Sequence, residues 1–294
     1  MRDEFSRFHP INNFIYFSAV ITFSAIYREP GLLIISLFCA SVYSLYLSGR
    51  KSLSLSFKVI LPIALFAALI NALFNHNGMT VLRYLPTGNP ITLESIIFGI
   101  CAALLLSCVI LWFFCLNKVI TSDKFIYLFG RIIPSLSLVL SMILRYVPLF
   151  KEQHQRVSAA QRSLENCTDK SLKTRLRHSL NVFSIMLTWS LENSILTADS
   201  MNSRGYGLKG RTAFSYYKFY FRDGVLIAAQ LALITLQIML TVFGCSKSEF
   251  YPFYEYQINA VKIFGYISYS LICLLPIIIN LTEDIKWNYF RSRI

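Results

Sequence analysis

Six long apolar blocks constrain this chain more than any other feature of its sequence. They lie at roughly residues 12–27, 31–49, 58–75, 95–117, 222–244 and 258–282. A helix of about 20 apolar residues is long enough to cross the ~30 Å hydrocarbon layer of a bilayer. Because hydrophobic residues make up 55% of the chain and gather in these blocks, the sequence predicts an all-α polytopic membrane protein with about six transmembrane helices.

The short loops between these blocks predict how the chain is oriented in the membrane. The N-terminus lacks a small-residue cleavage site, so the first block is expected to be a true span. Residues 48–58 form a basic loop, which the positive-inside rule assigns to the cytoplasm, whereas 75–94 is rich in turn formers and nearly uncharged. With a basic C-terminal tail as well, both termini are predicted to be cytoplasmic in a multi-pass cell-membrane protein.

The positive charge of the chain is concentrated between the fourth and fifth blocks. Residues 118–222 hold 16 of the 28 Lys and Arg residues and six acidic residues. In a membrane protein this bias is typical of a cytoplasmic region, and no nucleic-acid binding is expected from it. We therefore predict three parts: N-terminal spans in 1–117, a cytoplasmic or interfacial region in 118–221, and C-terminal spans with the basic tail in 222–294.

The middle region is predicted to contain two long amphipathic helices. Residues 132–150 are apolar and run into the polar helix 151–165. In 182–204, an apolar stripe at helical spacing comprises Leu187, Leu191, Ile195, Ala198 and Met201. Carboxylates beside that stripe make a membrane crossing costly, so these helices are expected to lie along or just under the membrane as a docking platform.

Cysteine and histidine residues give no strong indication of a metal site, a cofactor or an enzyme. The histidines lie in separate segments, and no C-x-x-C pair occurs. Cys101, Cys108 and Cys115 share one helix face at a spacing of seven. A metal or redox stripe is one interpretation, but a close-packing face of small residues is favoured.

The stretch GYGLKGRT at 205–212 satisfies G-x-G-x-x-G and nearly matches a phosphate-binding P-loop. Both motifs require a strand before the glycines. Here a helix precedes them, and Arg211 replaces the P-loop lysine. We therefore predict a helix C-terminus, with Gly205 or Gly207 in the left-handed cap conformation.

The order of these features resembles the T component of energy-coupling factor (ECF) transporters, the CbiQ/EcfT family. The resemblance runs from His9-Pro10 to the GRT at 210–212 and includes ITSDKFIYLFGRIIPSLSLVLSMILRYVPLF, which resembles the segment leading into that family's coupling helices. Ser203-Arg204-Gly205 matches the second of the family's two short Ala-Arg-Gly-like motifs.

This resemblance implies a non-enzymatic scaffold in an ABC-type importer of a prokaryotic cell membrane. Two cytoplasmic ATPase subunits would bind the ends of the coupling helices, and a membrane-embedded S component would capture a vitamin, a metal ion or a similar micronutrient. In the family, the arginine of each motif inserts into a groove of one ATPase subunit, and Arg204 matches the arginine of the second motif.

The first motif departs from the family pattern. After AAQ the family places its arginine motif near 163–165, but this chain reads Arg162-Ser163-Leu164-Glu165. Arg162 and Leu164 are about 200° apart on a helix. Either Leu164 makes an apolar contact while Arg162 reaches round, or this end docks differently; a solvated surface charge is the other interpretation of Arg162. The departure favours two unlike ATPase subunits and gives Arg204 the larger share of the docking energy.

Two other functions are weighed against this one. A secondary transporter with a midplane substrate site predicts charged or broken segments inside the spans. An intramembrane enzyme predicts a catalytic constellation at one depth. The spans contain little of either beyond Lys262, which lies near a helix end. The last span, 258–282, is additional to the single C-terminal span usual in the family.

Overall fold

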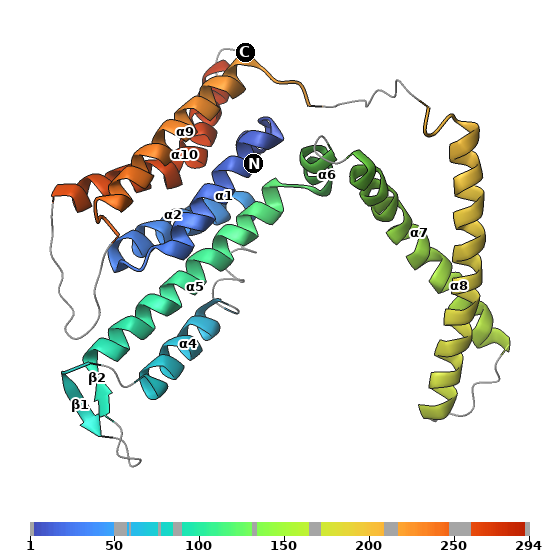
Figure 1. Ribbon diagram of the computed structural model, residues 1–294, viewed down its shortest axis with the longest axis horizontal. Helices are drawn as coiled ribbons and strands as arrows, with labels where there is room; N and C mark the ends of the chain where they lie inside the picture. The colour runs from blue at the N-terminus through green and yellow to red at the C-terminus, as the bar shows by residue number, and fades with distance from the viewer. Residues whose placement is uncertain are drawn as a thin grey trace. The chain divides into compact units, whose positions relative to one another are not determined.

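Helices form nearly all of the described chain, and they divide into two compact units (Figure 1). The computed structural model describes residues 3–49, 58, 60–75, 78–84, 90–130, 134–164, 172–208, 217–246 and 260–291. One unit, here called the bundle, comprises Met1–Phe125 and Tyr217–Ile294. The other, the helix-pair unit, comprises Ile126–Tyr216.

The bundle contains a short 3-10 helix, six α-helices and a β-hairpin among its described residues. They are η1 (Phe5–Arg7), α1 (Pro10–Ile26), α2 (Pro30–Ser48), α4 (Leu61–Phe74), β1 (Val81–Tyr84), β2 (Pro90–Thr92), α5 (Leu93–Val119), α9 (Phe221–Val242) and α10 (Ala260–Arg291). A further short helix, α6 (Ser122–Gly130), contains the boundary between the two units.

Local sequence explains where several of these helices begin. Pro10 and Pro30 stand at the first position of α1 and α2, where proline loses no helical hydrogen bond and its fixed φ suits the helix. Thr92 caps α5, since its side chain accepts from the amide of Ser95 at 3.3 Å. Glu94 in the first turn of α5 suits the positive end of the helix dipole.

The helices confirm the prediction of an all-α membrane protein. Four of them, α2, α5, α9 and α10, are long and apolar enough to cross a membrane. The predicted blocks 12–27 and 58–75 coincide with shorter apolar helices, α1 with 17 residues and α4 with 14. The count of six spans therefore stays a prediction.

The loop after α4 contains a β-hairpin that was not predicted from the sequence. β1 and β2 pair antiparallel, with Val81 opposite Thr92 and Tyr84 opposite Pro90. Thr, Val and Tyr favour extended backbone, and a two-stranded ribbon has only edge strands, where proline is tolerated. Turn formers in 75–94 indicated a loop, but its strand pairing depends on contacts across the hairpin.

An aromatic cluster forms part of the bundle core. The ring of Phe5 lies 5.2 Å from that of Tyr16, and Tyr16 lies 6.1 Å from Trp112, both edge-to-face. All three side chains are buried. The N-terminal turn η1 is thereby packed into the core, because its Phe5 inserts among residues of α1 and α5.

Buried polar groups link α10 to the N-terminal helices across the middle of the bundle. The hydroxyl of Ser24 lies 2.9 Å from that of Tyr269 and 3.0 Å from that of Ser36, which also accepts from Trp112 Nε1 at 2.9 Å. Such paired polar side chains hold helices together where no water is present. The helix α10, which contains the predicted final span, is therefore part of the bundle core.

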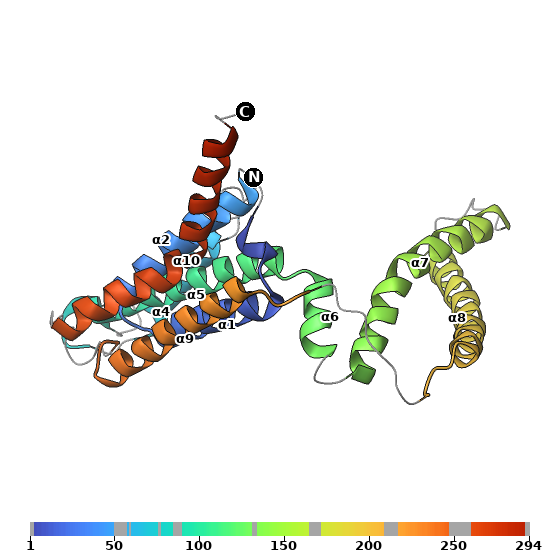
Figure 2. The same cartoon turned by 90° about the horizontal axis from the view of Figure 1, so that it is seen from above.

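Polar contacts also fix α10 near its start and in its second half. Near its start, Lys262 Nζ lies 3.1 Å from Glu29 Oε1, which also accepts from the Tyr266 hydroxyl at 2.7 Å. Further along, Asn280 Oδ1 accepts from the amide of Phe5 at 3.0 Å. Figure 2 shows the helix changing direction along its length, and α10 contains Pro276, which removes one helical hydrogen bond.

The predicted cysteine stripe lies on a packing face of α5. Cys101, Cys108 and Cys115 are all buried, and Cys108 Sγ lies 3.2 Å from the carbonyl of Leu33 in α2. Small thiol side chains let these two helices approach closely. These contacts support the packing interpretation of the stripe.

The helix-pair unit consists of α7 (Pro134–Leu164) and α8 (Leu172–Ser203). They contact through Tyr146 and Thr197, whose hydroxyls are 2.6 Å apart, and through the rings of Phe150 and Trp189, 5.3 Å apart. The apolar and polar segments predicted as successive pieces form one helix, α7, which continues through Pro148.

The predicted apolar stripe of α8 is not the face that packs most closely on α7. Leu187, Leu191 and Ile195 are 47%, 59% and 63% exposed. The direct contacts to α7 come from residues offset from that stripe, among them His178, Trp189 and Thr197. Four members of the stripe, Leu187, Leu191, Ala198 and Met201, line the clefts between the two helices. The periodicity identified the more apolar face, and in a soluble protein that face would be buried.

Candidate partner-docking site

The motif Ser203-Arg204-Gly205 forms the C-terminal end of α8. The amide of Tyr206 donates to the carbonyl of Met201 and that of Gly205 to the carbonyl of Asn202, both at 3.0 Å. This is the Schellman pattern, in which the residue after the C-cap adopts a left-handed conformation. Gly205 does so with φ of 77°, and Gly207 follows with φ of 94°, which confirms the prediction that glycines end this helix.

Arg204 is exposed at this helix end. Among the described residues, no carboxylate lies within ion-pair distance of its guanidinium. Ser203 Oγ donates back to the carbonyl of Asp199 at 2.9 Å, so the serine is used within the helix. A cation suits the negative end of the helix dipole, and its planar fork of donors remains available to carboxylates or carbonyls of another molecule.

The first motif occupies the equivalent place at the end of α7. The helix ends at Leu164, which is 78% exposed. Ser163 Oγ donates back to the carbonyl of Ala159 at 3.1 Å, as Ser203 does on α8. Arg162 is exposed in the last turn, whereas Glu165 lies outside the described residues. Both motifs thus end the long helices of one unit, each beside a serine that bonds its own helix.

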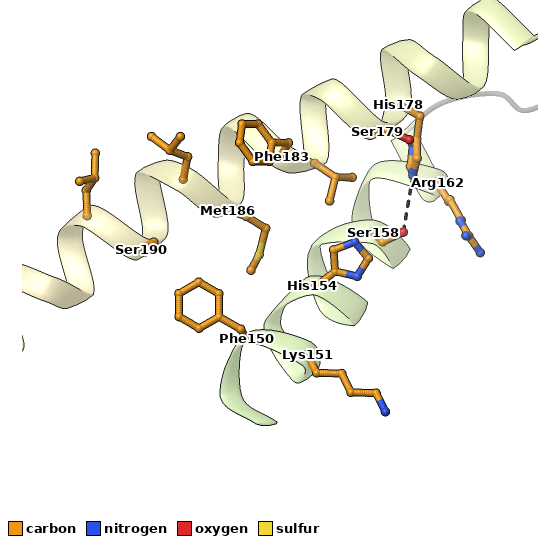
Figure 3. A pocket seen from close by; sticks show the side chains of 13 residues that line it. Phe150, Lys151, His154, Ser158, Arg162, His178, Ser179, Phe183, Met186 and Ser190 are labelled. Carbon is orange, nitrogen blue, oxygen red and sulfur yellow. Dashed lines mark hydrogen bonds between the residues drawn. The ribbon is translucent and has the colours of Figure 1, made fainter. Parts of the chain in front are cut away.

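A cleft of about 790 Å³ separates the C-terminal half of α7 from the N-terminal half of α8. In Figure 3, Phe150, His154 and Met186 lie between the two helices, while Lys151 and Arg162 point away from α8. Ser158 Oγ and His178 Nε2 are 3.5 Å apart at the narrow end of the cleft. Arg162 therefore lines the cleft but directs its guanidinium away from α8.

A second cleft of about 610 Å³ lies further along the helices and is more apolar. Its wall includes Ile143, Val147 and Met201, of which Ile143 and Val147 are 50% and 59% exposed. The helix pair thus presents apolar surface as well as cations. Such surface is typical of a site that contacts another protein or a membrane.

The polar inner face of the helix pair was not predicted from the sequence. His154 and Ser158 are four residues apart on α7 and face α8 together, which is a spacing that could have been read from the sequence. His178, their partner across the cleft, could not be assigned, because it lies on a different helix. Among the described residues, no group of three or more His, Cys, Asp or Glu side chains is placed to hold a metal ion.

The glycine-rich stretch after α8 is only partly described. A helix precedes Gly205, whereas a nucleotide-binding turn would need a strand there. This is the local structure predicted from the sequence. Gly210 and Arg211 lie outside the described residues. The geometry of the described part is that of a helix C-terminus.

Comparison with known families finds one match over most of the chain. The family model described as CbiQ, cobalt transport protein, matches residues 5–216. The match includes α1 through α8 and both arginine motifs, and it ends before α9 and α10. A comparison with curated proteins gives no match.

Proposed function

The chain belongs to the CbiQ cobalt transport protein family, and from this membership and the geometry above we propose that it is the T component of an ECF-type importer. In this proposal, cytoplasmic ATPase subunits hydrolyse ATP and the chain itself is not an enzyme. The helix pair transmits their motion to a membrane-embedded S component. The cargo is a micronutrient such as a vitamin or a transition-metal ion, and the matched family's description names cobalt.

One observation carries this proposal more than any other. Arg162 and Arg204 stand at the C-terminal ends of the two long helices of one unit, exposed and without a carboxylate partner among the described residues. Two such ends suit two binding grooves, one on each of two ATPase subunits. The two motifs differ in sequence, Arg162-Ser163-Leu164-Glu165 against Ser203-Arg204-Gly205, which supports a pair of unlike ATPase subunits.

The guanidinium of Arg204 suits a partner that supplies hydrogen-bond acceptors, above all carboxylates. A guanidinium can donate two parallel hydrogen bonds to a carboxylate, and such charge-assisted pairs are among the strongest polar contacts. An interface arginine in a desolvated groove often contributes about 2 kcal/mol or more. Reversing the charge at Arg204 should therefore weaken the complex at least about tenfold.

The test is co-purification with ABC ATPase subunits from the same genome, expressed together with the full chain. The wild type and Arg177→Glu, an exposed arginine of the same helix outside the motif, should retain both ATPase subunits. Arg204→Glu should lose them, and Arg162→Glu should lose less. Unchanged retention by Arg204→Glu would remove Arg204 from the docking site, and a wild type that never binds ATPases would contradict the proposal.

A secondary transporter is the alternative, and the described spans give it less support. Such a protein needs ionisable groups available to a substrate near the middle of the membrane. Glu29 and Lys262 are buried, and they pair with each other at 3.1 Å near the start of α10. We therefore propose the T-component function alone.

A further inference from the structure

The N-terminal segment of the bundle contacts both points where the chain connects to the helix-pair unit. The chain leaves the bundle through Val119–Lys124, here called the exit root, and returns through Tyr220–Asp223, here called the return root. About 100 residues separate the two roots in sequence. Residues of η1 and the start of α1 bind each of them.

The exit root is held through the ammonium group of Lys124, which is only 6% exposed. Its Nζ donates to the backbone carbonyl of Ser6, to Ser6 Oγ at 3.0 Å and to the carbonyl of Val119 at 2.9 Å. In the amide orientation that satisfies its neighbours, Asn13 accepts from the same ammonium at 3.2 Å and donates to the carbonyl of Phe5 at 3.0 Å. The first turn of α6 is thereby tied to the N-terminal segment.

The return root is held through the carboxylate of Asp223, which is 1% exposed. Oδ1 accepts from the amide of His9 at 3.2 Å and from Asn12 Nδ2 at 3.5 Å, and Oδ2 accepts from the amide of Tyr220 at 2.9 Å. Asn12 Nδ2 also lies 3.3 Å from the backbone carbonyl of Asp223. The first turn of α9 is tied to the same segment as the exit root.

Neighbouring residues of one helix make these two attachments. Asn12 contacts the return root and Asn13 the exit root, so a displacement of either root acts on the same turn of α1. The turn is connected to α10 through η1, because Asn13 donates to the carbonyl of Phe5 and Phe5 donates its amide to Asn280 of α10.

We propose that Asn12 and Asn13, together with Lys124 and Asp223, form a clasp that joins both roots into one rigid support for the helix-pair unit. The clasp rests on the proposed function for its use: with one segment holding both roots, motion that a partner imposes on α7 and α8 would act on the two roots together. Its residues position the two roots and do not contact cargo.

Amide hydrogen exchange on the full chain in lipid nanodiscs tests the clasp without any partner. Lys124→Met should raise amide exchange about tenfold at the return root (217–224) as well as at its own exit root (119–125). Asp223→Asn should likewise raise exchange about tenfold at the exit root as well as at its own return root. Asn13→Leu is a milder variant that removes one acceptor of the ammonium and should act in the same direction. Lys118→Met, at an exposed lysine six residues earlier, should change neither root.

Reciprocity is the deciding result of this experiment. If each variant loosens only its own root, the two attachments are independent and the clasp is wrong. Slow exchange at the centre of α5 in every variant shows that the bundle remains folded. A variant that loses this protection is replaced by Asn13→Leu for the comparison.

Transport by the chain reconstituted with its ATPases tests what the clasp does. Lys124→Met and Asn13→Leu should bind ATPases as the wild type does, but should move several-fold less cargo per ATP hydrolysed. An unchanged ratio with loosened roots would refute the role in transmission. If the wild type binds no ATPase, the proposed function fails, while the reciprocal exchange result still decides whether the clasp exists.

Discussion

The bundle and the helix-pair unit bury their side chains in opposite ways. The bundle encloses aromatic residues such as Trp112 and pairs its buried polar groups with one another. In the helix-pair unit, Val182 is the one buried side chain among the described residues, while Leu187, Leu191 and Ile195 are exposed. The bundle therefore carries its own core, whereas the helix pair exposes apolar surface of the kind typical of protein or membrane contact sites.

Charged groups follow the same division. In the bundle, Glu29 pairs with Lys262, and Asp223 accepts hydrogen bonds from three residues. In the helix-pair unit, Arg162 and Arg204 are exposed at helix ends. A buried ion must find its partners within the fold, because an uncompensated charge there is very costly. An exposed arginine can keep its donors for a partner, and in the proposed function this difference separates the supporting bundle from the docking surface.

The largest expected effect comes from breaking the buried ion pair of the bundle. Lys262→Met leaves the Glu29 carboxylate buried without its cation, which should lower the free energy of unfolding by about 3–5 kcal/mol. The double variant Glu29→Gln, Lys262→Met should recover much of this loss. Thermal unfolding in detergent measures both, and equal losses in the two variants would show that the pair contributes little.

A matched pair of substitutions compares the two units directly. Trp112 is buried and donates to Ser36 at 2.9 Å, so Trp112→Phe should cost about 2 kcal/mol through a lost hydrogen bond and a cavity. Trp189 packs on Phe150 in the exposed helix pair, and Trp189→Phe should cost less than about 1 kcal/mol. Equal losses of thermal stability would contradict the difference between the units.

A pH series probes the boundary of the bundle at Lys124. Burial lowers the pKa of Lys124 from 10.5 to about 8, so between pH 8 and 10 the unfolded chain holds a proton that the folded chain has released. Stability should therefore rise with pH across this window, by about 1–2 kcal/mol from this residue. Lys124→Met should remove that part of the rise, and an identical pH profile in both proteins would show that Lys124 titrates normally.

The smallest effect is expected at the end of α8. Gly205 has φ of 77°, and an added Cβ would lie 2.9 Å from Leu208 Cδ1, so Gly205→Ala should cost about 1 kcal/mol and fray the helix end. Asn tolerates the left-handed conformation better, so Gly205→Asn should retain more ATPase binding than Gly205→Ala. The two variants binding alike would mean that the cap does not position Arg204.

The sequence predicted the helices of the bundle better than it predicted what joins them. Each of the six apolar blocks coincides with a helix because membrane thickness sets the length of an apolar run, and prolines mark two helix starts. The contacts of the clasp could not be predicted from the sequence, since His9 and Asp223 are 214 residues apart. Contacts at that separation leave no local period in a single sequence.

The docking site was predicted only in part, because its local features can be read from the sequence and its contacts cannot. The glycines after Arg204 indicated a helix end, and Gly205 has the left-handed conformation expected there. The apolar stripe of α8 was also identified, but its orientation was not, because hydrophobic periodicity marks a face without saying what covers it. The roles of Ser203, Arg204 and Gly205, and of Arg162 through Glu165, stay predictions.

Hydrogen exchange of the chain alone and bound to its ATPases tests the central claim most directly. If the helix pair is the docking surface and the bundle is its support, amide protection at residues 158–164 and 199–206 should rise about tenfold in the complex. Protection at the centre of α5 should stay the same. A rise confined to the bundle, or no change at either helix end, would contradict the account.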